Sequence, residues 1–112
     1  RITGISSSSA DCRSSKGRNL AAGGVPVEFG IPATCGNIAN GAEELKYEQV
    51  GRDIVAMSVE FVTRVHNFDG LVMIASCDNI IAGCYLAAMR LDIPSMVVTG
   101  GSMQQGSTAA RL

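Results

Sequence analysis

The sequence predicts an α/β domain, a parallel sheet with βαβ crossovers. Short apolar runs of strand length alternate with longer segments of helical periodicity, and the order along the chain is strand, helix, strand, helix, strand. Strand–helix–strand connections within one parallel sheet are nearly always right-handed. Three strands make a marginal sheet for a free domain, so we expect the chain to be part of a larger domain.

The first predicted strand is VPVEF, at residues 25–29. Pro26 has no backbone N–H to donate, which favours an edge position or a strand start. The preceding residues 1–24 are rich in Ser, Gly and Arg and lack periodicity, so we predict a loop-rich segment there. The following residues 30–47 are expected to form a long loop with one turn of helix, and loops of this length are usually functional or disordered.

The clearest helical pattern lies at residues 48–66. Apolar residues recur there at spacings of four, three, four and four, which places them on one helix face. They are Val50, Ile54, Met57, Phe61 and Val65. The single histidine, His66, falls at the C-terminal end of this helix, where a positive charge complements the helix dipole. We therefore interpret His66 as structural and not as a catalytic base.

The second half of the chain predicts two further strands and a helix. LVMIA, at residues 71–75, is a continuous apolar run, which indicates a strand buried on both faces. A helix follows at about 79–91 and ends before Pro94. Its predicted buried face consists of Ile80, Ile81, Cys84, Ala87, Ala88 and Leu91. SMVVTGG, at residues 95–101, predicts another buried strand that leads into glycines.

The chain therefore divides into three parts: a loop-rich N-terminal segment at residues 1–24, an α/β core at 25–103 and a tail at 104–112. The tail shows no finished secondary-structure element, so we expect it to be incomplete.

The composition argues against several classes of protein. The chain has 112 residues, of which 46% are hydrophobic and 17% charged, so it can build one domain with a core and is not disordered. A formal net charge of -1 and the absence of Trp argue against nucleic-acid binding. No apolar stretch approaches the roughly 18 residues that a membrane span needs, and the first residues lack a signal-peptide core. We expect a cytoplasmic protein.

Cys77 and Asp78 come shortly after the strand predicted at 71–75. Parallel sheets bind ligands at the carboxyl ends of their strands, so this position favours a functional site. One interpretation is a metal site with a thiolate and a carboxylate ligand, both favoured by the N-terminus of the next helix. The other is a buried thiol beside an Asp that caps the helix.

Other cysteines are candidates for the same site, since a cytosolic chain keeps its thiols reduced or bound to metal. Cys35, with Gly36 and Asn37, should lie at the same sheet edge, either as a wall of the site or as a turn with a buried thiol. Cys12 would be an exposed thiol in a Ser-rich loop, for which metal ligation is one explanation and chance another. The cysteine spacings match no zinc module.

The third strand also ends in a candidate segment, formed by Gly100, Gly101 and Ser102. It is either a strand-exit turn that uses the conformational freedom of glycine or a loop of backbone N–H groups that binds an anion. It lacks the spacing of a P-loop.

Two segments carry a family resemblance: AGGVPVEFGIPATCGNIANG, and the stretch from GRDIVAMSVEF to VTGGSM. Their most specific parts are Cys77-Asp78 with Gly83 downstream, the helix end AAMRLDIP and the strand exit VTGGSM. Over residues 22–103 the chain resembles the N-terminal part of the dihydroxyacid dehydratase / phosphogluconate dehydratase family.

This resemblance implies a hydro-lyase that dehydrates a 2,3-dihydroxy acid to a 2-keto acid, as in branched-chain amino acid biosynthesis. It implies two cofactors: an iron–sulfur cluster (2Fe-2S or 4Fe-4S) that binds the leaving hydroxyl, and a Mg²⁺ ion that steadies the carboxylate and the enolate. It also implies a homodimer and a C-terminal domain that this chain does not contain. The isolated chain is then expected to be inactive.

By position, the resemblance implies that Cys77 is a cluster ligand and Asp78 a Mg²⁺ ligand, with Cys12 as the candidate for another cluster cysteine. Cys84 matches no ligand and is assigned to the core. Gly36 replaces an aspartate, and Asn79 replaces a lysine that is carbamylated in the family. Both replaced residues are Mg²⁺ ligands there, whereas Asn37 and Asn79 offer neutral oxygens.

Two alternatives remain open. A non-catalytic paralogue, which uses the fold for assembly or ligand binding, is suggested by Gly36 and Asn79. A flavodoxin-like or nucleotide-binding α/β module explains the order of strands and helices, but it explains neither Cys77 nor the long loop at 30–47.

Overall fold

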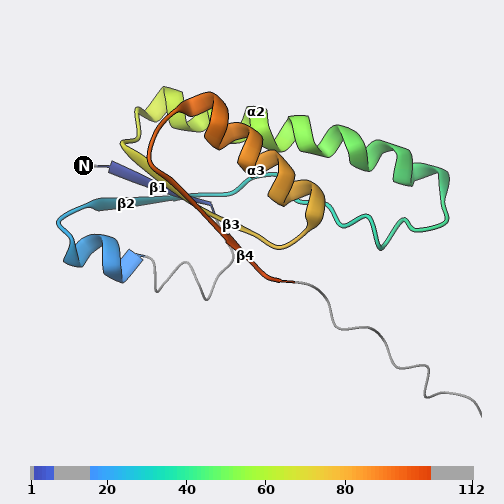
Figure 1. Cartoon of the computed structure of the whole chain (residues 1–112), viewed down its shortest axis with the longest axis horizontal. Helices are drawn as coiled ribbons and strands as arrows, with labels where there is room; N and C mark the ends of the chain where they lie inside the picture. The colour runs from blue at the N-terminus through green and yellow to red at the C-terminus, as the bar shows by residue number, and fades with distance from the viewer. Residues whose placement is uncertain (1, 7–15, 102–112) are drawn as a thin grey trace, which may run out of the picture.

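The computed structural model describes residues 2–6 and 16–101, which contain a four-stranded parallel sheet in the order β2-β1-β3-β4 (Figure 1). The strands are β1 (Ile2–Ser6), β2 (Val25–Phe29), β3 (Gly70–Ala75) and β4 (Ser95–Thr99). The prediction of an α/β fold with a parallel sheet is therefore confirmed. The edge position predicted from Pro26 is confirmed as well, because among the described strands β2 pairs only with β1.

The two long helices are α2 (Glu48–His66) and α3 (Asp78–Leu91), and both lie where the sequence predicts them. The short 3-10 helix η1 (Glu43–Tyr47) leads into α2 and is the helical turn expected in the long loop. Figure 1 shows α2 and α3 side by side over one face of the sheet. Among the described residues, no helix has both the length and the apolar character needed to cross a membrane.

The prediction of a loop over residues 1–24 is wrong in two places. Ile2–Ser6 form β1, an inner strand that pairs with β2 on one side and β3 on the other, and residues 16–21 are helical. Within the described residues the sheet consequently has four strands, where the sequence predicted three. The sequence ITGIS carries little apolar pattern. Backbone pairing with both neighbouring strands defines this strand, and such pairing cannot be read from the composition of the segment.

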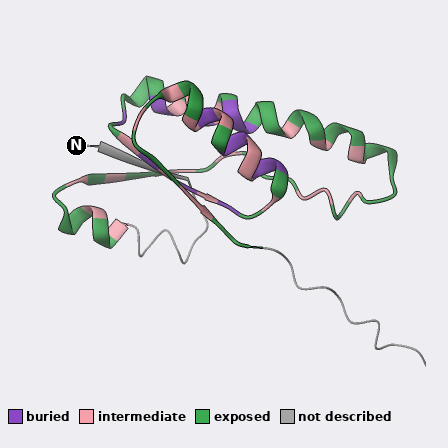
Figure 2. Ribbon diagram, in the orientation of Figure 1, coloured by how far each residue is buried: buried purple, intermediate pink, exposed green. Residues whose placement is uncertain are grey.

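The core lies between the two helices and one face of the sheet (Figure 2). Along β3 the burial alternates: Leu71, Met73 and Ala75 are buried, while Val72 and Ile74 are only half-buried. The prediction that this strand is buried on both faces is therefore wrong for the described chain. The prediction of a buried strand at 95–101 is also wrong, because β4 is exposed or half-buried throughout. In both cases the helices cover only one face.

The helices meet through small residues. A Cβ atom on Gly83 of α3 would lie 2.7 Å from Val55 Cβ and 2.8 Å from the Arg52 carbonyl oxygen of α2, so only glycine permits this approach. The residues that α2 buries are Val55, Ala56, Val59 and Thr63. Its five apolar residues at helical spacing, Val50 to Val65, lie instead on an outer face, with side chains 46–67% exposed. Of the buried face predicted for α3, Ile80, Cys84 and Ala87 are buried and the other three are half-buried.

The Gly83 contact gives a first testable prediction. Gly83→Ala should lower the free energy of unfolding by about 1–2 kcal/mol, because overpacking against a backbone carbonyl outweighs the gain in helix propensity. Gly51→Ala in α2 is the matched control, since its added Cβ would meet only the Thr34 hydroxyl oxygen, at an ordinary 3.6 Å. That control should stabilise by up to about 1 kcal/mol. Urea unfolding measures both changes, and equal stabilisation by the two variants would contradict the packing argument.

Candidate functional site

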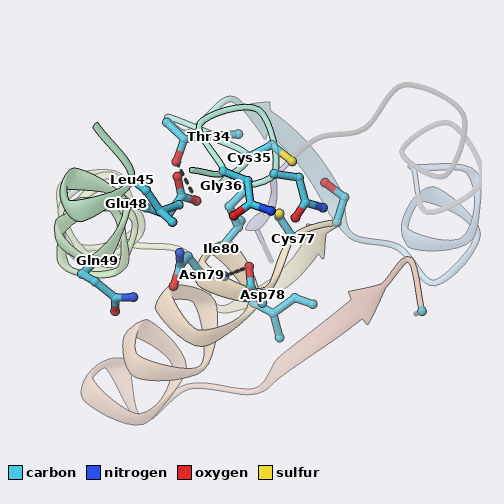
Figure 3. Close-up of a pocket in the computed structure, with 16 residues that line it drawn as sticks. Thr34, Cys35, Gly36, Leu45, Glu48, Gln49, Cys77, Asp78, Asn79 and Ile80 are labelled. Carbon is cyan, nitrogen blue, oxygen red and sulfur yellow. Dashed lines mark hydrogen bonds between the residues drawn. The ribbon is translucent and has the colours of Figure 1, made fainter. Parts of the chain in front are cut away.

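A pocket of about 690 Å³ opens at the carboxyl ends of β3 and β4. It is lined by residues 33–37 from the loop after β2, residues 48 and 49 from the start of α2, residues 76–81 after β3 and residue 101 after β4. Figure 3 shows these side chains converging from the separate elements. The three segments singled out from the sequence are thus brought to one edge of the sheet, where parallel sheets bind ligands.

Cys77 occupies the N-cap position of α3 with an extended backbone, and its carbonyl oxygen accepts a hydrogen bond from the Ile81 N–H at 2.8 Å. Asp78 is the first residue of the helix, and its Oδ1 accepts a hydrogen bond from the neighbouring Asn79 N–H at 2.9 Å. The interpretation of Asp78 as the N-cap is therefore wrong by one residue. The turn fixes the backbone of Cys77 and leaves the exposed Asp78 carboxylate beside the half-buried Cys77 thiol at the pocket.

The thiols of Cys35 and Cys77 face one another across the pocket (Figure 3). Partial burial raises the pKa of Cys77 above that of an ordinary thiol, and a hydrogen bond with the Cys35 side chain raises it further. A backbone hydrogen bond at Asp78 lowers this pKa, while the negative charges of Cys35 and Asp78 raise it, and the net shift is upward. At neutral pH Cys77 is a neutral thiol. The backbone hydrogen bond is the contribution expected of a helix N-terminus, and burial and the Cys35 side chain offset it.

This arrangement predicts that Cys35→Ala lowers the pKa of Cys77, because the variant removes both a hydrogen bond to the neutral thiol and a like charge. The measurement is the pH dependence of Cys77 alkylation by iodoacetamide, followed peptide by peptide by mass spectrometry. The midpoint should move to lower pH in the variant. Cys84, whose pKa burial raises to about 11, is the internal control and should stay unreactive in both proteins. An unmoved midpoint would contradict the pairing.

Asn79 joins the two helices beside the pocket. It is buried, and its Oδ1 accepts a hydrogen bond from Arg52 Nε of α2 at 2.6 Å. The sequence suggested that Asn79 offers a neutral oxygen to a metal ion. In the structure that oxygen is already engaged by a guanidinium, which repels a cation. Sequence reasoning missed the role of Arg52, because its partner lies 27 residues away and no local pattern links the two.

The Arg52–Asn79 contact can be tested by a double-mutant cycle. Arg52→Ala should destabilise the fold by about 1–2 kcal/mol, since the buried Asn79 oxygen loses its charged hydrogen-bond donor. Asn79→Ala should cost less at this contact, because Arg52 is exposed and its guanidinium can then bind water. The double variant should cost less than the sum, with a coupling of about 0.5–1 kcal/mol in urea unfolding. Strict additivity would show that the two side chains do not depend on one another.

The Glu48 side chain fills the space beside Gly36. A Cβ atom on Gly36 would lie 3.3 Å from Glu48 Cγ and Cδ and 3.3 Å from Leu45 Cδ1. The Glu48 Oε1 accepts a hydrogen bond from Thr34 Oγ1 at 3.3 Å, which holds the carboxylate at this wall (Figure 3). The sequence offered one weak signal for Glu48, an acidic residue in the first turn of a helix. Within the described residues, no three His, Cys, Asp or Glu side chains are arranged to hold a metal ion.

The remaining candidates are placed as follows. Gly101 lines the pocket with a positive φ of 76°, while the Gly100 N–H donates to the Ala75 carbonyl at 3.2 Å and is not open to an anion. Cys84 is fully buried in the core, as assigned. His66 stacks on Phe68 with ring centroids 5.6 Å apart and takes no part in the pocket lining. Cys12, Ser102 and the tail at 104–112 lie outside the described residues.

Comparison with known proteins gives the family. Residues 13–112 match the family model described as dihydroxy-acid/6-phosphogluconate dehydratase, N-terminal. The chain belongs to this family. The resemblance identified in the sequence, with its cysteine–aspartate pair and glycine-rich strand exit, is therefore confirmed.

Individual relatives support the same assignment. The dihydroxy-acid dehydratase of Methanoregula boonei is 46% identical over 91 residues, which cover 81% of this chain and 16% of the relative. Those of Halothermothrix orenii and Archaeoglobus fulgidus are each 51% identical, over 85 and 83 residues, and the matches cover 76% and 74% of this chain and 15% of either relative. The chain thus spans about one sixth of the length of these relatives.

Proposed function

We propose that this chain is the N-terminal part of a hydro-lyase that dehydrates a 2,3-dihydroxy acid to a 2-keto acid. Membership of the dehydratase family carries the proposal, and the pocket with Cys77 and Asp78 at the sheet edge supports it. The relatives named above are dihydroxy-acid dehydratases of which this chain covers only about 16%. We infer that the catalytic base lies elsewhere in such a protein, and that the whole protein is a cytoplasmic homodimer.

An iron–sulfur cluster suits part of this pocket. Thiolates are its usual ligands, and Cys77 presents its thiol at the pocket from a helix N-cap, a rigid position. Metal binding deprotonates a thiol, so cluster uptake at Cys77 would release a proton despite the raised pKa. We propose Cys77 as one ligand and Cys12 as a second. When bound, the cluster would supply a Lewis-acidic iron for the leaving hydroxyl.

A Mg²⁺ ion does not suit the described residues. Position 36 carries no side chain, and the Asn79 oxygen is held by Arg52 at 2.6 Å. Two described carboxylates line the pocket, Asp78 and Glu48, and that of Glu48 is already hydrogen-bonded to Thr34, whereas the family resemblance expects several hard ligands here. The pocket offers hydrogen-bonding groups instead, namely the side chains of Asn37, Gln49 and Asp78. We propose that they orient the hydroxyl groups of the substrate.

The experiment is a comparison of the full-length protein with Cys77→Ser and Cys84→Ser, all purified without oxygen. Cys84→Ser is the matched control, since it removes a core thiol away from the pocket. We expect iron, sulfide, visible absorption and 2-keto acid formation to be lost in Cys77→Ser, and cluster content to be retained in Cys84→Ser. A folded, iron-free wild-type protein without turnover would overturn the dehydratase proposal.

The engaged Asn79 and the missing side chain at position 36 favour a second candidate, a non-catalytic paralogue that binds hydroxy acids. The same experiment separates the two. A cluster on Cys77 without any 2-keto acid formation from dihydroxy acids, with or without added Mg²⁺, is the outcome expected of the paralogue. Turnover by the wild-type protein would exclude it.

A further inference from the structure

We propose that Cys35 and Cys77 form a reversible disulfide whenever the pocket holds no cluster, with a glutathione-type disulfide as the oxidant. The inference does not rest on the dehydratase proposal. It needs only two thiols in contact at a pocket that a small disulfide can reach.

Contact between the two thiols is built into the fold. Cys35 comes from the loop after β2 and Cys77 from the N-cap of α3, yet both side chains line the same pocket and their sulfur atoms lie toward one another there (Figure 3). Each backbone is held by its own turn: the Cys35 carbonyl accepts the Ile38 N–H at 3.1 Å, and the Cys77 carbonyl accepts the Ile81 N–H at 2.8 Å. The thiols therefore meet without any rearrangement of helices or strands.

Both thiols are also accessible, since each is half-buried and both line the open pocket. Cys84 differs in both respects, because it is fully buried in the core between α2 and α3. Reactivity toward a small disulfide depends on access, so the oxidant should select Cys35 and Cys77 over Cys84.

The reaction proceeds by two exchange steps. A thiolate of the pair attacks one sulfur of glutathione disulfide, which breaks the glutathione S–S bond, forms a mixed disulfide and releases one glutathione. The second thiolate then attacks the protein sulfur of the mixed disulfide, closes the Cys35–Cys77 bond and releases the second glutathione. The two protein thiols are oxidised, glutathione disulfide is reduced, and the two thiol protons end on the released glutathiones.

The disulfide and a cluster bound at Cys77 exclude one another, because one sulfur cannot serve both. The oxidised pair would keep Cys77 from irreversible oxidation to sulfinic acid while the cluster is absent. Reduction by thiols would return it to a ligand. The Cys35–Cys77 disulfide is therefore a reversible, cluster-free state of the pocket under oxidising conditions.

The test uses the full-length protein after cluster removal, equilibrated without oxygen in glutathione buffers of increasing oxidised-to-reduced ratio. Free thiols are then blocked, the protein is digested without reduction, and the peptides are mapped by mass spectrometry. We expect a peptide pair linked through Cys35 and Cys77, lighter by two hydrogen atoms, in most molecules at the oxidising end. Dithiothreitol should remove it.

Two variants sharpen the result. Cys35→Ser should lack the linked pair and instead keep a glutathione adduct on Cys77, whereas Cys84→Ser should form the linked pair as the wild-type protein does. Free Cys35 and Cys77 at every ratio, a persistent adduct on wild-type Cys77, or a bond from Cys77 to Cys12 would each overturn the proposal. The linked peptide is sought in the wild-type protein, so the test does not depend on how the variants fold.

Discussion

The close approach of α2 and α3 at Gly83 fixes most of what surrounds the pocket. A Cβ atom on Gly83 would lie within 3 Å of Val55 Cβ and of the Arg52 carbonyl oxygen. The backbone of α3 therefore packs directly against the first half of α2. This contact brings Asn79 within reach of Arg52 and sets the N-terminus of α3 beside Glu48 at the start of α2. The side chains that line the pocket are therefore positioned by a contact between two helix backbones, which is stiffer than any loop.

Packing of this kind decides the chemistry that the pocket can hold. The edge of a parallel sheet offers backbone positions, but the side chains that meet there depend on the angle and depth of the helices. Here they bring two thiols together and join one amide to a guanidinium. The same helix that supplies Cys77 also buries Cys84 nearly two turns later, so one element carries an accessible thiol and a buried one. The two cysteines differ in accessibility because their burial and their neighbouring groups differ.

The helices, three strands and the sheet edge that gathers the pocket could be predicted from the sequence, because each depends on a local pattern or on the general geometry of parallel sheets. The strand β1 could not, since ITGIS has weak periodicity and is specified by pairing with β2 and β3. Apolar spacing found α2 but not its buried side, because the side that α2 buries carries smaller residues, Val55, Ala56, Val59 and Thr63, than its exposed apolar side. The pairing of Arg52 with Asn79 crosses 27 residues of sequence and leaves no local signal.

The two departures from the family pattern, Gly36 and Asn79, each have a partner on α2. Glu48 occupies the space that a side chain at 36 would need, and Arg52 holds the amide at 79. An aspartate at 36 would meet the Glu48 carboxylate, a like charge at short range, and a free lysine amine at 79 would face the Arg52 guanidinium. In the metal-free protein each of these side chains would therefore be repelled by its neighbour on α2, whereas a carbamylated, negatively charged lysine would be attracted to Arg52. Gly36 with Glu48 and Asn79 with Arg52 are therefore two consistent pairs, in which a side chain of α2 lies against each of the two positions.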